Sequence, residues 1–471
     1  MNDFLMNTIC FELEDAVGRD NVSVRTADKI VHSMDYFWLP RMYVDNGNLP
    51  PLADFIVYPG SAEEVSKVLV IANYYKIPVY PWGGGSGSQG GALPVKGGIL
   101  LDTKRMNHVL DFDEKSMTVT VETGMIFTQL EWYANERGYS LMHYPSSINC
   151  GTVGGFLAHN GIGVLSTKYG KIDDQCLSLE VVIPNGQTLK TSPVPKHSSG
   201  PNLTAMFIGS EGTLGVITKA TFKLFKLPEV RKFRAFLFKS VEDGVNAGRD
   251  LVHQVKPSII RLYDEAETVS LIRKVIGFAK PGAFMNVAIE GAADDVELEE
   301  KHMLEIAEKY GAEDLGSDYG EKWWDSRLTF FYPDKCLDFP LMYGTMDTVA
   351  TYSNIEKIYW AMKKEVEKFE GVRFIAHFSH WYEWGCMMYD RFIMDNPPED
   401  PDEAFRLHNE IWSAGVRAAL ENGGVINDHH GVGIKLGRLM KEQYGPSMIV
   451  FEGLKKTLDP NGIMNPYKMG I

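Results

Sequence analysis

The chain has 471 residues, and its 62 acidic and 47 basic residues give a net charge of −15. This length allows about three domains with substantial cores, and the acidic balance argues against a nucleic-acid partner, which would require a basic stripe. The five cysteines are scattered without metal-ligand spacing, which argues against a disulfide framework, a metal site or an iron–sulfur cluster. Because neither a signal peptide nor an apolar run of about 18 residues is evident, we expect a cytoplasmic protein without a transmembrane segment.

The first half of the sequence predicts a mixed pattern of strands and helices. Residues 1–50 predict a helical segment followed by an irregular aromatic stretch, and a capping box at Ser61 opens the first helix after it. Up to a boundary near residue 228, the apolar patterns predict strands at 55–58, 77–80, 99–102, 109–112, 117–122, 179–183 and 216–224 and helices at 65–75 and 127–138.

Beyond residue 228 the chain is poor in glycine and rich in aromatic residues. It mixes strands with amphipathic helices, which predicts an α+β unit. The expected strands are 233–238, 284–290 and 373–381, and the expected helices are 241–254, 296–310 and 355–369. Near the end of the chain, residues 424–430 predict a strand and residues 447–458 a helix.

Glycine is over-represented, with 45 residues, and gathers in three clusters at 83–91, 151–170 and 209–215. Glycine permits positive φ and close approach of the backbone to a ligand, and successive N–H groups suit a pyrophosphate. Gly85 to Gly90 match G-x-G-x-x-G, but no helix follows directly, so we reject a Rossmann dinucleotide site. The clusters instead predict another kind of cofactor cradle, with a plain surface loop as the alternative for the first cluster.

In order and separation, the three clusters resemble the FAD-binding domain of the vanillyl-alcohol oxidase/p-cresol methylhydroxylase (PCMH) superfamily. The resemblance implies an α+β fold: an N-terminal helical segment (1–50), a two-part PCMH-type FAD-binding domain (51–228), a cap or substrate domain with an antiparallel sheet (229–415), and a C-terminal segment (416–471) that completes the active site and returns to the FAD domain. The residues it implies at FAD are Pro81, Trp82, Gly83, Gly84, Gly85, Ser86, Gly87, Pro145, Ser146, Ser147, Gly151, Thr152, Gly154, Gly155, His159, Asn160, Gly161, Glu211, Gly212, Gly215, Val216 and Ile217.

The first glycine loop lacks the histidine with which some members of this superfamily tether FAD, so we expect non-covalent FAD. Cys150 precedes a Thr-Val-Gly segment similar to one at which some relatives attach the flavin. Attachment at Cys150 is the alternative, although a cysteine needs a special environment to react.

The second half resembles alkyldihydroxyacetonephosphate synthase, in which a tyrosine matching Tyr389 and histidines matching 428–430 face the flavin. On a strand, Asp428 and His430 would share one face and His429 the other, so that a carboxylate beside an imidazole creates a general base. The alternative is a pair of structural histidines. His377 and His380 would face opposite ways on their strand, and at least one is expected to be structural.

Two departures from that synthase family weaken the case for its reaction. Asp428 replaces the first histidine of the family's triplet, and Lys335 stands where the family has an arginine, so bidentate phosphate recognition is lost. The segment Ala158-His-Asn-Gly161 instead resembles the flavin subunits of glycolate oxidase and D-lactate dehydrogenase. Those relatives hold the substrate carboxylate with an arginine in a Trp-x-x-Arg setting that Arg327 matches, and Arg261 is the other candidate.

The sequence therefore predicts an FAD-linked oxidase or dehydrogenase acting on a CH–OH group of a small hydroxy acid or phenolic alcohol. Hydride would pass to flavin N5, with Asp428, His429, His430 and Tyr389 catalytic and with Arg261, Arg327, Lys335 and His380 around the substrate. The alternatives are a transferase of the ether-synthase type, which uses a flavin–substrate adduct, and a flavin-binding protein without turnover. Expected partners are the substrate, an electron-transfer flavoprotein or other electron acceptor, and a second copy of the chain in a homodimer.

Overall fold

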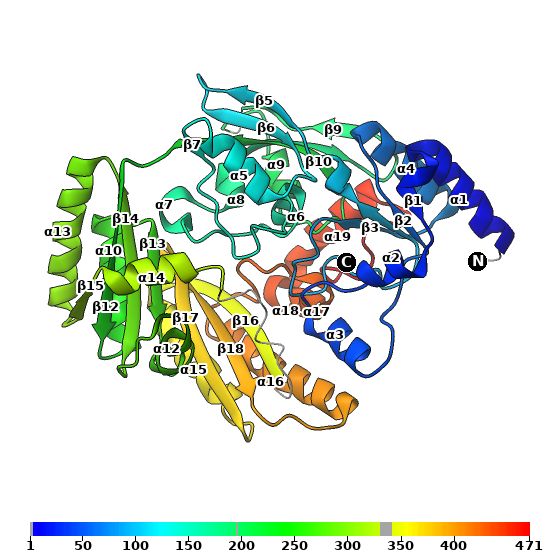
Figure 1. The fold of residues 1–471 in the computed structure, drawn as a ribbon. Coiled ribbons are helices and arrows are strands. Elements are labelled where there is room, and N and C mark those ends of the chain that lie inside the picture. The colour runs from blue at the N-terminus through cyan, green and yellow to red at the C-terminus, as the bar shows by residue number, and fades with distance from the viewer. Residues whose placement is uncertain (1–2, 195, 330–341) are drawn as a thin grey trace.

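The fold is known from a computed structural model that describes residues 3–194, 196–329 and 342–471. Its N-terminal part, shown in blue to green in Figure 1, carries a four-stranded sheet of order β1-β2-β4-β3, in which β2, β4 and β3 are parallel. The strands are β1 (Val22–Ser23), β2 (Phe55–Val57), β3 (Val79–Trp82) and β4 (Ile99–Asp102). The helices around it are α1 (Asp3–Val17), α2 (Thr26–Val31), α3 (Trp38–Asp45) and α4 (Ala62–Tyr75).

Helix α4 begins where the sequence predicts a capping box. The Ser61 hydroxyl accepts a hydrogen bond from the Glu64 amide at 3.2 Å, and the Glu64 carboxylate accepts one from the Gly60 amide at 2.7 Å. These bonds satisfy amides that would otherwise lack partners at the helix end. The apolar face of α4 then packs on α1 and on the first sheet through Val65, Val68 and Leu69.

A second sheet of the N-terminal part is antiparallel, with the order β5-β6-β10-β8-β9. A hairpin follows Val182, because β8 and β9 pair antiparallel across the turn that contains Gly186. Its strands are β5 (Val109–Asp113), β6 (Thr118–Glu122), β8 (Cys176–Val182), β9 (Thr188–Lys190) and β10 (Val216–Lys223), and a two-stranded pair joins β7 (Tyr139–Ser140) to β11 (Phe225–Lys226). The helices are α5 (Phe127–Asn135), α6 (Val153–Ala158), α7 (Ser166–Tyr169), α8 (Ile172–Gln175) and α9 (Leu203–Phe207).

The cap, here residues 230–329 and 342–421, carries the antiparallel sheet that the sequence predicts. Its seven strands have the order β15-β12-β14-β13-β17-β18-β16. They are β12 (Val230–Phe238), β13 (Ile259–Tyr263), β14 (Ala283–Gly291), β15 (Glu313–Gly316), β16 (Met342–Thr351), β17 (Val372–Tyr382) and β18 (Gly385–Met394). The helices are α10 (Val241–Gln254), α11 (Glu265–Glu267), α12 (Arg273–Ile276), α13 (Ala293–Lys309), α14 (Asp318–Ser326), α15 (Tyr352–Val366) and α16 (Pro401–Glu421).

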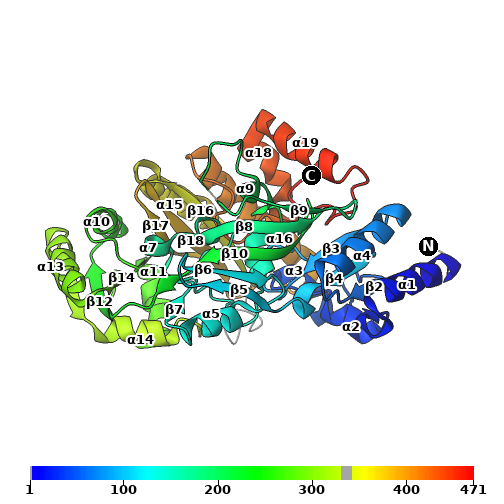
Figure 2. The ribbon, with the colours of Figure 1, turned by 90° about the horizontal axis from the view of Figure 1, so that it is seen from above.

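The two faces of the cap sheet have different partners. On one face, apolar side chains such as Met346, Phe374 and Met388 form a large core with α10, α13, α15 and α16. The other face meets α14 and α7, so it turns toward the N-terminal part of the chain (Figures 1 and 2). Because side chains alternate along a strand, Arg261, Tyr389 and Asp347 point to this second face, here called the inner face.

A β-bulge corrects one expectation about β17. Between Phe378 and His380 the register with β18 shifts by one residue. A bulge places two residues opposite one and re-aims the side chains that follow it. His377 and His380 therefore do not face opposite ways as expected; both reach the inner face and line the same cavity.

The C-terminal segment differs from the sequence prediction. Residues 424–430 form a loop instead of a strand, and α17 (Gly433–Leu436), α18 (Met440–Tyr444) and α19 (Met448–Leu458) follow it. Met464 then pairs with Val79 of β3 through a parallel bridge, so the chain end returns to the first sheet. Among the helices of the described residues, none is long and apolar enough to cross a membrane.

Asp390 provides a test of this cap core. Its side chain points into the helix-covered face of the sheet, and neither carboxylate oxygen has a hydrogen-bond partner among the described residues. Burial raises the pKa of Asp390 well above its usual range, so the folded protein keeps a proton that the unfolded chain releases. The wild-type protein should therefore lose stability as the pH rises from the unfolded pKa toward the raised folded pKa.

We expect the Asp390→Asn variant not to lose stability in this way as the pH rises. Its free energy of unfolding relative to wild type should rise between pH 5 and pH 8, by up to about 1.4 kcal/mol per pH unit. Urea denaturation at both pH values measures the difference, with the exposed Asp395→Asn as control. A constant difference at the two pH values would contradict the assignment of a proton to Asp390.

Candidate functional site

Two adjoining cavities are found, one within the N-terminal part beside His430 and the other between the N-terminal part and the cap. The first, here the glycine cavity, has a volume of ≈ 130 Å³ and is lined by residues of all three glycine clusters. The second, here the cap cavity, has a volume of ≈ 140 Å³ and is lined by the inner face of the cap sheet and by residues 86–88 and 145–147. They form one continuous space, because both are lined by Ser86, Gly87, Phe156, His159 and His430.

The wall of the glycine cavity is built from closely packed backbone. A Cβ atom at Gly84 would collide with the carbonyl oxygen of Cys150, and one at Gly83 would collide with the hydroxyl of Thr152. The first and second glycine clusters can therefore approach each other only because these side chains are missing. Thr152 in turn caps α6, since its hydroxyl accepts a hydrogen bond from the Gly155 amide at 3.1 Å.

Gly87 is different, because nothing in the protein explains the missing side chain. Its φ is not positive, and a Cβ atom there would meet no protein atom within 4 Å. The space beside it belongs to both cavities. At this position, the missing side chain leaves space that only a ligand would occupy.

Glu211 joins the glycine cavity to the histidine loop of the C-terminal segment. Its carboxylate accepts hydrogen bonds from the amides of Val432 and Gly433, the latter at 2.7 Å. Burial raises the pKa of Glu211 to about 7, although these two amides oppose the shift. Glu211 was predicted at the cofactor, and it also fixes the loop that carries His429 and His430.

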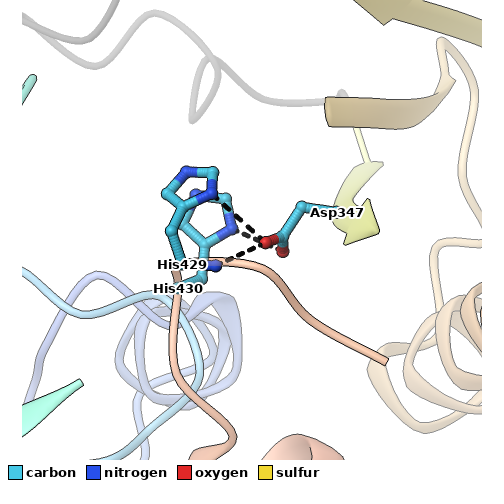
Figure 3. A group of neighbouring side chains, drawn as sticks. All are labelled: Asp347, His429 and His430. Atoms are coloured by element: carbon cyan, nitrogen blue, oxygen red, sulfur yellow. Dashed lines mark hydrogen bonds and ion pairs between the residues drawn. The ribbon is translucent and has the colours of Figure 1, made fainter. Parts of the chain in front are cut away.

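The histidine pair is organised by one buried carboxylate, that of Asp347 on β16 (Figure 3). His430 Nδ1 lies 2.7 Å from Asp347 Oδ1, and His429 Nδ1 lies 3.3 Å from Asp347 Oδ2. The amides of residues 428 and 429 also donate to Asp347 Oδ2, at 2.8 and 3.0 Å. Burial opposes ionisation, but the two imidazoles and these amides hold the pKa of Asp347 well below its usual range.

An ionised carboxylate only accepts hydrogen bonds, so this network assigns the proton of His430 to Nδ1 and leaves Nε2 as the basic nitrogen. The same carboxylate and that of Asp428, 3.2 Å away, fix His429 in the same way. Burial lowers the pKa of His429, and Asp347 and Asp428 counteract part of the shift. Neutral imidazoles with a free Nε2 are suited to accept a proton.

Asp428 has a different place from the one predicted. Because residues 424–430 form a loop, Asp428 does not share a strand face with His430, and Asp347 takes the place expected for it beside His430. Asp428 instead contacts His429 and meets Lys171, whose Nζ lies 3.6 Å from Oδ1 and donates to the Asp428 carbonyl at 2.7 Å. Burial opposes the shift, and Lys171 lowers the pKa of Asp428.

Tyr389 lies beside the histidine pair on β18. Its ring stacks on His377 with centroids 4.9 Å apart, and the ring of His430 meets it edge-on at 5.1 Å. His377 in turn lies 3.0 Å from a carboxylate oxygen of Glu267, which also accepts a hydrogen bond from Arg391. The tyrosine is thus held in one orientation at the wall of the cap cavity.

Two other histidines of the cap cavity are held neutral. Burial lowers the pKa of His159 to about 4, and its Nδ1 lies 2.6 Å from the Gly155 carbonyl. Burial also lowers the pKa of His380 well below its usual range, and nearby Arg261 adds to the shift. His380 Nδ1 lies 2.9 Å from the Ser166 hydroxyl, so its position depends on the N-terminal part.

The residues predicted to bind a substrate anion do not all line the same cavity. Arg261 lines the cap cavity and also a small hollow of ≈ 20 Å³ behind it. Arg327 lines only the hollow, where its guanidinium stacks on Trp324 with 3.9 Å to the ring centroid. Lys335 lies outside the described residues.

Most residues predicted at the cofactor line the two cavities, while Asn160 and Gly161 follow α6 without lining either. Sequence reasoning missed Asp347, whose signal is an acidic residue on an apolar strand, and Lys435, which lines the cap cavity. It also missed Lys171, because a lysine near Asp428 is a contact between segments far apart in the chain.

Asp347, His429 and His430 each offer one atom that could bind a metal ion, and these three atoms lie within 4.8 Å of one another. Their arrangement is nevertheless that of a hydrogen-bond network. Asp347 already accepts from Nδ1 of His430, from the Asn427 amide group at 2.8 Å, and from two backbone amides. These donors occupy the oxygens that a cation would need.

Comparison with known proteins shows which protein family the chain belongs to. Residues 53–192 match the FAD binding domain, and residues 227–469 match the C-terminal domain of FAD linked oxidases. The chain is 30% identical to alkyldihydroxyacetonephosphate synthase of Dictyostelium discoideum over 99% of this chain and 80% of that protein. It is 31% identical to mitochondrial D-lactate dehydrogenase [cytochrome] of Arabidopsis thaliana over 90% of this chain and 74% of that protein. A solved structure of p-cresol methylhydroxylase with bound substrate, 20% identical, covers 100% of this chain and 98% of that chain with a TM-score of 0.76.

The chain therefore belongs to the FAD-linked oxidases. The α+β fold of the PCMH type and the FAD cofactor, both expected from the glycine clusters, are confirmed. The glycine cavity fits this cofactor, because its open wall at Gly87 and its backbone-lined loops suit a bulky dinucleotide.

The fit can be tested at Gly87. We expect Gly87→Leu to fold normally, because its Cβ atom would enter open space, but to bind FAD at least about 10-fold more weakly, because the side chain occupies the ligand space. Fluorescence titration of FAD into apoprotein measures the affinity, and thermal unfolding of the apoprotein measures the fold. Gly453→Leu, an exposed change on α19, is the control; equal FAD affinity in all three proteins would show that FAD lies elsewhere.

Asp347 can be tested as the residue that positions the histidines. We expect Asp347→Asn to retain FAD but to reduce flavin about 10² to 10⁴-fold more slowly with any substrate that bleaches the wild type, because the histidines lose their fixed tautomer. The acidic limb of the pH–rate profile, which reports protonation of the base, should move to lower pH, because the removed negative charge supported imidazole basicity. A variant with a lower rate and an unmoved profile would reduce Asp347 to a structural role.

Proposed function

We propose that this FAD-linked oxidase oxidises the C–OH group of a small hydroxy acid to a carbonyl. The observation that carries the proposal is a buried arginine, Arg261, at the wall of the cap cavity with no carboxylate partner among the residues that the structure describes. Oxidation of a hydroxy acid requires a base that accepts the hydroxyl proton and a group that binds the carboxylate. Side chains of both kinds line the cap cavity.

Arg261 is 7% exposed, and no hydrogen bond or ion pair of its guanidinium is found among the residues that the structure describes. It lies over Trp323, with 5.4 Å to the ring centroid. Burial lowers the pKa of Arg261, yet a guanidinium stays charged in proteins. An uncompensated buried charge is costly, so the site favours an anion that enters the cavity. A substrate carboxylate supplies that charge with two oxygens in the geometry of the guanidinium.

The proton of the substrate hydroxyl would go to Nε2 of His429 or His430, because Nδ1 of each ring is engaged by a carboxylate. When bound, FAD supplies the acceptor for the hydride that leaves the substrate carbon. Tyr389, which contacts His430 at its edge, would orient the hydroxyl. The substrate thus loses one proton to the protein and one hydride to the cofactor, which balances its conversion to a carbonyl.

We further propose that FAD is held without a covalent bond. Cys150, the alternative from the sequence, lines neither cavity. Its sulfur lies 3.5 Å from the Ser147 carbonyl, and its own carbonyl faces Gly84. These contacts support a packing role for Cys150.

A second candidate is an ether-synthase type of transferase, favoured by the similarity to alkyldihydroxyacetonephosphate synthase along nearly the whole chain. Asp428, which stands in place of the first histidine of that family's triplet, distinguishes this site from the pattern expected for that family. The two reactions differ in an observable way, since only oxidation leaves the flavin reduced.

Anaerobic mixing of the FAD-loaded protein with a panel of 2-hydroxy acids tests the proposal. We expect at least one acid to bleach the flavin band, its methyl ester to do so poorly, and Arg261→Met to raise the acid's apparent Kd by about 10 to 100-fold. Arg417→Met, an exposed arginine paired with Glu442, is the matched control. Bleaching by acyl-dihydroxyacetone phosphate alone, or equal reaction of acid and ester, would overturn the proposal.

A further inference from the structure

A second cationic side chain lines the cap cavity on the side away from Arg261. Lys435 belongs to α17, and its ammonium lies 4.6 Å from the ring centroid of Trp412 and 5.9 Å from that of Phe37. Within residues 3–194, 196–329 and 342–471, the ammonium has no hydrogen bond and no ion pair with a carboxylate. The aromatic rings stabilise a positive charge but do not neutralise it.

The backbone of Lys435 is fixed at a place from which its side chain reaches the cap cavity. The amides of Ile434 and Lys435 donate to the Gln89 carbonyl at 3.1 and 3.3 Å. Gly433 lies so close to Gln89 that a Cβ atom there would collide with the same carbonyl. The contact holds α17 against the first glycine cluster and directs Lys435 to the cavity.

The charged groups nearest to Lys435 are already engaged. Asp347 accepts from the two histidines and from the amides of residues 428 and 429. Arg438 adds positive charge and donates to the Ser413 hydroxyl at 2.6 Å. Burial lowers the pKa of Lys435 to about 7, since desolvation penalises the ammonium, so an anion beside it would restore its charge.

Lys435 and Arg261 lie at opposite sides of the inner face. Arg261 is on β13, and Trp412, which lies under Lys435, donates to the Thr345 carbonyl on β16 at 3.0 Å. β13 and β16 are three strand spacings apart in the order β13-β17-β18-β16, about 14 Å in all. Tyr389 on β18 and the histidine pair above Asp347 lie between the two cations.

We propose that Lys435 forms a second anion subsite, so that the substrate carries another anionic group, a carboxylate or a phosphate, distant from its C–OH group. This inference rests on the proposed function, because it extends the same substrate beyond the carboxylate at Arg261. The hydroxyl-bearing carbon is then placed by two charges, one on each side of the histidines.

Binding titrations with unreactive probes test the subsite without turnover. Linear dicarboxylates from succinate to suberate, and the monocarboxylates of equal length, are titrated into FAD-loaded protein and followed by the flavin difference spectrum. We expect one diacid length to bind at least about 10-fold more tightly than its monoacid, as a charge-assisted bond to Lys435 requires. Phosphonoalkanoates of the same lengths, which like the diacids carry no hydroxyl, are the second arm; whichever arm shows the larger advantage over the monoacid identifies the distal group.

The variant Lys435→Met keeps the packing of the stem on Trp412 and removes the charge. Its ratio of dianion to monoanion affinity should fall to about one, while Lys435→Arg should retain part of the advantage. Lys441→Met, which is 71% exposed on α18, is the control and should leave the ratio unchanged. Thermal unfolding and FAD content show that each variant is folded.

The failures of the two proposals are distinguishable. If monoanions bind through Arg261 but no dianion binds more tightly, or if Lys435→Met leaves the ratio intact, the second subsite is wrong and the proposed function stands. If neither monoanions nor dianions perturb the flavin spectrum, and Arg261→Met leaves the apparent Kd of the hydroxy acid unchanged, then the proposed carboxylate site at Arg261 is wrong.

Discussion

The site depends on the carboxylate of Glu211, which binds the backbone amides of Val432 and Gly433 across the boundary between the N-terminal part and the C-terminal segment. Glu211 belongs to the third glycine cluster and lines the cofactor cavity, while the loop that it holds carries the histidine pair. Two amides aimed at one buried carboxylate fix the loop in position and orientation. Together with the bonds from α17 to Gln89 and from Lys171 to Asp428, this contact sets the distance between the cofactor cavity and the proposed base.

Sequence analysis reached much of the cofactor site because that site is built from local backbone. Glycines such as Gly85 and Gly90 are required by positive φ within a short segment, and such requirements are visible in the sequence. The capping box at Ser61 was visible for the same reason. The mixture of strands and amphipathic helices likewise predicted an α+β cap, and the family resemblance implied its antiparallel sheet, although not the order of the seven described strands.

The substrate side was harder to predict because it depends on contacts between distant segments. The predicted strand at 424–430 is a loop, since its amides bind the side chains of Thr348, Gln443 and Asp347 instead of a neighbouring strand. The bulge at Phe378 reversed the expected opposition of His377 and His380, and strand periodicity alone does not reveal a bulge. The buried and uncompensated charges of Arg261 and Lys435 likewise become apparent only when their neighbours are known.

The return of the chain end to the first sheet has a consequence for biosynthesis. Met464 bridges to Val79, and the Asn465 side chain donates to the carbonyls of Gly91 and Glu211 at 2.8 and 2.6 Å. Segments that meet here are separated by most of the chain, so this wall of the cofactor cavity closes only after nearly the whole polypeptide has left the ribosome. Until then the glycine loops lack these tethers, and cofactor uptake becomes a late step that marks completion of the fold.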